Sequence, residues 1–136
     1  MSNSIIRAAL ETRLKAWADA QVPKIPFAAE GASFTKPSSG GFLQPTLLPN
    51  GTVNNDLSGT RKTYIGIFDV RCWYPSGRGM GEVEKMSNSI INLFPLIPKT
   101  GGVSIENTPY AEHPELDTSG WIIVPVMIMY RYEALT

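Results

Sequence analysis

The stretch GIFDVRCWYPSGRGMGEVEKM, from Gly66 to Met86, contains the change of pattern that decides the fold. Its first part alternates between two kinds of side chain with a period of two, which is typical of a β-strand. Its second part repeats apolar residues every three or four positions, which predicts an amphipathic helix. The sequence therefore predicts a strand over residues 61–74, a glycine-rich turn over residues 77–81, and a helix after that turn.

The same order of strand, glycine turn and helix is also found in phosphate-binding loops. A dinucleotide fingerprint would need its third glycine where Glu82 stands, and the chain has no Gly-Lys pair for a P-loop. Glu82 and Glu84 suit the positive N-terminal end of a helix, but they would repel a phosphate. We therefore interpret residues 77–81 as a turn that displays Arg78, and we expect no cofactor.

The N-terminal segment predicts the first helix, over residues 4–20. Apolar residues recur there at spacings of four, four and three, which places them on one helix face; they are Ile6, Leu10, Leu14 and Trp17. Ser4 can cap the start of this helix, and Pro23 marks its end.

Short apolar runs separated by proline, glycine and polar residues follow the first helix. Residues 25–30 and 42–48 are expected to form strands, and Pro45 predicts that the second of these lies at a sheet edge or carries a bulge. Residues 49–51, Pro-Asn-Gly, predict a turn.

The C-terminal part predicts two strands, over residues 102–107 and 120–132, separated by a polar loop over residues 108–120. The last strand is apolar on both faces and should be central, although Pro125 indicates a bulge or a local edge. The expected architecture is a single α+β domain, residues 1–136, in the order α-β-β-β-α-β-β. It has a mixed, mainly antiparallel sheet of about five strands with two helices packed on it.

Composition excludes several classes of protein. Twelve basic and twelve acidic residues cancel, so nothing indicates binding to a membrane or sequence-specific binding to nucleic acid. The single cysteine, Cys72, cannot form an internal disulfide and is expected to be a buried thiol. The N-terminus lacks the pattern of a signal peptide, and we expect a soluble intracellular protein.

The only histidine, His113, lies beside three carboxylates, Glu112, Glu115 and Asp117. This group could carry out acid–base chemistry or bind a metal, but neighbours in a loop rarely converge on one point and no second histidine is present. A solvated acidic loop is the better interpretation. A small metal-dependent hydrolase is kept as a less favoured alternative, and we expect no catalytic or metal-binding residue.

Four segments taken in order resemble the tail-terminator-like proteins of long-tailed bacteriophages. They are IIRAALETRLKAW, PFAAEGASFTKPSSGGFLQPTLLP, GIFDVRCWYPSGRGMGEVEKMSNSIINLFP and GWIIVPVMIMYRY. The resemblance covers most of the chain and leaves residues 49–60 and 108–118 unconstrained. No catalytic residue is carried over from that family.

The resemblance implies a structural role in the virion tail. Such proteins form a ring, usually hexameric, at the neck end of the tail tube, where the ring stops tube polymerisation and presents a surface to head-completion or connector proteins. The implied partners are copies of this chain, the tail tube protein and a head-completion protein, with room for the genome to pass through the lumen. Assembly would take place in the host cytoplasm. Another neck or tail component, such as a head–tail connector or a tube subunit, is the alternative.

A ring requires two different surface patches that meet between neighbouring copies. We expect the loops over residues 49–60 and 75–81 to supply such contacts. The candidate interface residues are Leu47, Leu48, Val53, Leu57, Arg61, Arg78 and Met80. Leu47 and Leu48 could equally be residues of the core or of an edge strand.

Overall fold

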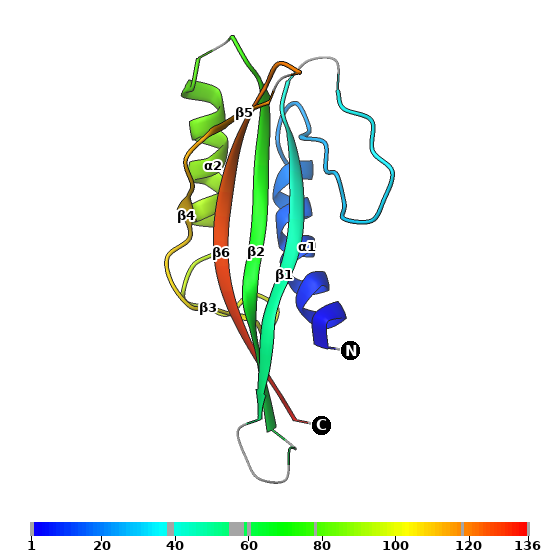
Figure 1. The fold of residues 1–136 in the computed structure, drawn as a ribbon, viewed down its shortest axis with the longest axis vertical. Helices are drawn as coiled ribbons and strands as arrows, with labels where there is room; N and C mark the ends of the chain where they lie inside the picture. Colours follow the sequence, from blue (N-terminus) through cyan, green and yellow to red (C-terminus); the bar gives the residue numbers. More distant parts are fainter. Residues whose placement is uncertain are drawn as a thin grey trace.

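Two helices and a six-stranded sheet make up the described part of the chain, in the order α-β-β-α-β-β-β-β (Figure 1). The computed structural model describes residues 2–37, 40–54, 59, 61–77, 79–117 and 119–135. The elements are α1 (Ser2–Asp19), β1 (Phe42–Asn54), β2 (Arg61–Pro75), α2 (Gly81–Leu93), β3 (Ser104–Ile105), β4 (Tyr110–Ala111), β5 (Glu115–Asp117) and β6 (Trp121–Leu135). The α+β class and the mainly antiparallel sheet expected from the sequence are confirmed.

The sheet is built on three long antiparallel strands in the order β1-β2-β6 (Figure 1). Phe68 in the middle of β2 lies opposite Leu47 on one side and Ile128 on the other. The short strands β3, β4 and β5 line the other edge of β6. β6 is therefore central, as its apolar pattern predicted.

Both helices pack on the same face of the sheet; in Figure 1, α1 is seen behind β1 and α2 is seen to the left of β6. The even-numbered side chains of β2 and β6 point into this layer because strand side chains alternate. The core includes Leu10 of α1, Ile90 of α2, Val70 of β2 and Val126 of β6, none of which has exposed surface. The amphipathic patterns of both helices are thus explained by one shared core.

Three local expectations about the first half of the chain are wrong. Ser4 lies inside α1, which begins at Ser2, so it does not cap the helix. Residues 25–30 form a single bridge, between Phe27 and Leu43, rather than a strand. Residues 49–51 do not reverse the chain, because β1 continues through them with a shift of register between Pro49 and Thr52.

The polar segment over residues 108–120 is not simply a loop. β4 and β5 pair with β6 there, and their partner residues supply backbone hydrogen-bonding groups that the side-chain pattern does not reveal. Pro125 explains why the two segments are separate. The carbonyl of Pro125 accepts a hydrogen bond from the Glu112 N–H at 2.8 Å, so it points toward the edge where β4 and β5 lie. The N–H and C=O of a strand residue point to the same side. Because proline has no N–H, Pro125 offers no donor at this edge, and the pairing is interrupted between β4 and β5. The pairing of β2 with β6 continues past Pro125 without a shift of register, so β6 has no bulge there. The expected local edge corresponds to the break between β4 and β5 on the other side of β6.

Candidate interaction surface

The second face of the sheet carries the odd-numbered side chains of β2 and β6, and no helix of the described chain covers it. We call it the helix-free face. Its middle is apolar: Ile65, Ile67, Met127 and Met129 are half-buried. Leu48 of β1 lies opposite Ile67 and is 45% exposed, and Val53, beyond the register shift, is 50% exposed. A patch of this kind on a small protein is typical of an interaction site.

Aromatic rings close one end of the helix-free face. The Phe42 ring stacks on Trp73 with 5.1 Å between centroids, and Trp121 meets Phe42 edge-on at 5.3 Å. The Lys36 ammonium lies 4.6 Å from the centre of the Trp73 ring, a distance suited to a cation–π contact. Phe34 also packs on Phe42, so the segment after α1 folds back over this end of the sheet.

An acidic group of side chains lies between the aromatic end and the apolar middle. Asp69 is 4% exposed, and its Oδ2 accepts from the Arg71 Nε at 3.4 Å. The same guanidinium lies 3.8 Å from Glu115 Oε1. By strand alternation Glu112 and Glu115 point to the helix-free face, because they lie opposite Pro125 and Ile123. The carboxylates of Asp69 and Glu115 therefore share one guanidinium, and Glu112 adds a third negative charge on this face.

The Asp69 carboxylate is not fully satisfied within the described chain. Its Oδ1 is buried and accepts no hydrogen bond from the described residues. Burial raises the pKa of Asp69, and Arg71 opposes that rise, while Glu115 and Glu112 add to it by repulsion. Since a buried carboxylate with a free oxygen is costly, this position is one that a cation from outside would stabilise.

The outer edge of β1 is blocked against strand addition along residues 43–49. The N–H groups of Leu43 and Leu47 donate to acceptors in the segment over residues 26–30, at 3.0 and 3.1 Å. Pro45 and Pro49 have no N–H to offer at the two remaining outward positions. An edge protected in this way disfavours open-ended sheet growth, so side chains are expected to make the contacts with partners.

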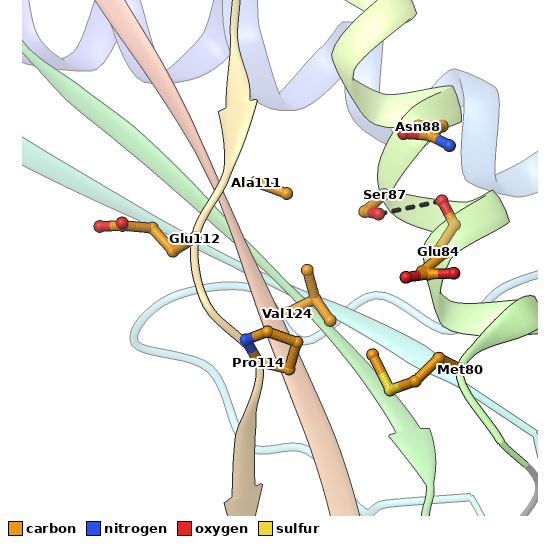
Figure 2. A pocket seen from close by; sticks show the side chains of 8 residues that line it. All are labelled: Met80, Glu84, Ser87, Asn88, Ala111, Glu112, Pro114 and Val124. Atoms are coloured by element: carbon orange, nitrogen blue, oxygen red, sulfur yellow. Dashed lines mark hydrogen bonds between the residues drawn. The ribbon is translucent and has the colours of Figure 1, made fainter.

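A hollow between α2 and the β4–β5 edge is the feature closest to an enzyme pocket (Figure 2). It is lined by Met80, Glu84, Ser87, Asn88, Ala111, Glu112, Pro114 and Val124. The Ser87 hydroxyl donates to the Glu84 main-chain oxygen at 3.0 Å, and the Glu112 carboxylate points away from the hollow. Among the residues that the structure describes, the hydroxyl of Ser87 is bonded to the main chain of its own helix and forms no hydrogen bond with a basic side chain.

The remaining candidates for chemistry are also accounted for. Cys72 has no exposed surface, and burial raises the pKa of its thiol to about 12, so it is not a nucleophile. Among the residues that the structure describes, no three His, Cys, Asp or Glu side chains are grouped to hold a metal ion, and His113 is exposed. Within the same residues, no helix is both long and apolar enough to cross a bilayer.

The residues proposed from sequence as interface candidates have different environments. Leu47 packs in the core with 4% of its surface exposed, as the alternative interpretation anticipated, so it offers little to a partner. Leu48, Val53 and Arg61 are exposed, whereas Met80 is half-buried against the core rather than displayed on the turn. The remaining two, Leu57 and Arg78, lie outside the described residues.

The acidic group and the aromatic cluster were not identified from the sequence as parts of an interaction surface. A signal for the first was present, because Asp69 stands among apolar residues in a strand, where an acidic side chain is unusual. Its grouping with Glu115 depends on the pairing of β5 with β6, which the polar composition of β5 conceals. The position of Lys36 on Trp73 depends on the path of a segment without regular structure.

The chain is similar to two solved structures and to one protein family. One solved structure, described only by a sequence identifier, is 31% identical over 96% of this chain and 95% of its own, with a TM-score of 0.78. A chain in the virion of a native gene transfer agent particle has a TM-score of 0.62, with each chain covered to 94%, but at 11% identity it is similar in fold alone. No curated protein matches. The family model for phage tail terminator protein matches residues 5–130, and this chain therefore belongs to the phage tail terminator family, a family of structural proteins of the virion tail.

Proposed function

We propose that this protein is the tail terminator itself: copies form a ring, expected to be hexameric, that caps the tail tube and stops its polymerisation. Family membership supports a place in the tail. The observation that carries the proposal is the helix-free face, where the exposed apolar side chains of Leu48 and Val53 lie on the same face as the exposed carboxylates of Glu112 and Glu115. A closed ring would cover such a patch on every copy.

The protection of both sheet edges supports a closed assembly over a growing one. Prolines and the segment over residues 26–30 block the β1 edge along residues 43–49, and β3, β4 and β5 lie along β6. A tube subunit must stack without limit, whereas a terminator must associate with the tube end and then stop. Contacts through side chains on a defined face suit the second task, since they end when the ring closes.

The proposed interface includes Leu48, Val53 and Arg61 from the described residues, together with Leu57 and Arg78 as sequence-based candidates. Leu47 is left out because it is in the core, and Met80 would contribute only its exposed part. The tail tube protein would contact one surface of the ring, and a head-completion or connector protein the other. The genome would pass through the lumen, and no catalytic step is involved.

Light scattering and negative-stain imaging of the purified protein, alone and with its tail tube protein, test this function. We expect discrete rings, or rings that form on tube ends, and tubes that become shorter as more terminator is added. Filaments formed by the protein alone would instead indicate a tube subunit. Tubes whose length and ends are unaffected by the protein would contradict the terminator role and leave a connector as the better interpretation.

A further inference from the structure

We propose that the acidic end of the helix-free face binds the basic tip of the β1–β2 hairpin of a second copy, so that the ring closes head to tail. The acidic end is defined as Asp69, Glu112 and Glu115, and the basic tip as Arg61 and Lys62. This inference rests on the proposed ring and names the charged contact that holds neighbouring copies in register.

The acidic end has the features of a receptor for a cationic side chain. Asp69 has a buried Oδ1 with no hydrogen-bond partner in the described chain, and only its Oδ2 reaches Arg71, at 3.4 Å. Arg71 also lies 3.8 Å from Glu115, so one guanidinium is divided between two carboxylates. Glu112 adds a third negative charge that acts on Asp69. A guanidinium or ammonium from outside would form charge-assisted hydrogen bonds with the exposed carboxylates of Glu112 and Glu115, and its positive charge would offset the electrostatic cost of the buried Asp69.

The basic tip lacks ion-pair partners among the described residues. Arg61 and Lys62 begin β2 and follow one another in sequence, and neither forms an ion pair with any described residue, although Arg131, farther along the sheet, pairs with both Glu106 and Glu133. Arg61 is exposed, and strand alternation directs it to the helix-free face. Lys62 alternates to the other face, so Arg61 is the cation that the tip presents on the helix-free face. Glu133, which lies opposite Thr63 on that face, is paired with Arg131 and leaves Arg61 available to an acidic partner.

The distance between the two groups requires that the partner be another molecule. Eight residues of β2 separate Arg61 from Asp69, which at about 3.3 Å per residue places them roughly 26 Å apart along one strand. Arg61 begins β2 and Asp69 lies near its middle, on the same face, so a single copy cannot join them. Identical copies that meet tip to acidic end form a heterologous contact, which closes into a ring when the rotation permits.

Charge reversal tests the contact in purified protein. Glu115→Arg and Arg61→Glu are each expected to raise the concentration needed for half-assembly at least tenfold, because each places like charges opposite one another. The double variant should recover most of that loss. Glu82→Arg, an exposed charge reversal in the first turn of α2, is the matched control and should assemble as the natural protein does.

A mixture of the two single variants gives a sharper result. In a ring where the two variants alternate, every second contact is natural, and each remaining contact joins the two substituted positions, which again carry opposite charges. Equal amounts of the two variants should therefore form even-numbered rings at concentrations at which neither forms rings alone. A discrete two-copy particle in place of rings would overturn head-to-tail closure.

The results of these experiments distinguish failure of the proposed contact from failure of the proposed ring. If the natural protein forms rings but the single reversals do not weaken them, or the mixture fails to assemble, the contact is refuted and the terminator function stands. If the reversals spare the ring and abolish only binding to the tube protein, the acidic end faces a different partner and the proposal is also refuted. Thermal unfolding of each variant, monitored by circular dichroism, must show that the monomers remain folded.

Discussion

Gly66, in the middle of β2, is expected to be required by packing rather than by backbone conformation, and Gly66→Ala tests this. Gly66 lies opposite Pro49 on one side and Tyr130 on the other. A Cβ at this position would lie 2.6 Å from the Leu48 main-chain oxygen and would also meet the Tyr130 hydroxyl. The carbonyl belongs to a strand and the tyrosine is 1% exposed, so neither can move aside freely.

The size of the effect follows from two opposing contributions. Alanine gains about 0.5–1 kcal/mol over glycine in a strand because the unfolded chain loses freedom. Overpacking a filled site costs roughly 1–3 kcal/mol. We expect a net loss of about 1–2 kcal/mol in the free energy of unfolding, which for a chain of this length lowers the Tm by roughly 4–8 °C.

Urea and thermal unfolding monitored by circular dichroism measure this change. Gly81→Ala is the matched control, because a Cβ there meets no atom within 4 Å, and we expect equal or greater stability. Tyr130→Phe in the Gly66→Ala background should restore part of the loss, since it removes the hydroxyl that the new methyl meets. If Gly66→Ala is as stable as the natural protein, the packing explanation of this glycine is refuted.

Three further predictions concern the core and the buried polar groups. Leu10→Ala should lower the free energy of unfolding by about 2–4 kcal/mol in urea, because the side chain is fully buried between α1 and the sheet. Cys72 should resist alkylation by iodoacetamide at pH 8 in the folded protein and react once urea unfolds it, because its pKa is raised to about 12; rapid labelling of folded protein would contradict this. Asp69→Asn should raise the Tm at pH 7, because burial raises the pKa of the natural carboxyl and its charged form is the costly one. Since a raised pKa contributes stability at low pH that is lost as the pH rises, the difference between the two proteins should shrink as the pH falls toward about 4; a difference independent of pH would refute it.

The same buried carboxylate connects monomer stability with assembly. Asp69→Asn removes a cost from the isolated chain and also removes a charge from the acidic end. We therefore expect this variant to be more stable as a monomer and poorer at ring formation. A charged residue kept in a costly position is a common feature of sites that acquire their partner only on binding.

The sequence alone determined the elements whose patterns are local. The alternation over residues 61–74 and the apolar repeats of the two helices specify which side chains face the core, because strand and helix periods depend on neighbouring residues only. Pro45 correctly indicated that β1 is an edge strand, because proline has no N–H and a strand inside the sheet, paired on both sides, would need that donor. The helix after residues 77–81 followed from the change in period.

The tertiary structure decided everything that depends on a distant partner. β4 and β5 are strands because β6 supplies their hydrogen bonds, although their composition is that of a polar loop. Gly66 is required because Tyr130, far later in the sequence, occupies the space beside it. Asp69 is buried, and joined to Glu115 through Arg71, only because strands distant in sequence are adjacent in the sheet. The periodicity of a segment indicates which face each side chain takes. The contacts described here depend on which distant strands pair, and no local pattern in the sequence specifies that pairing.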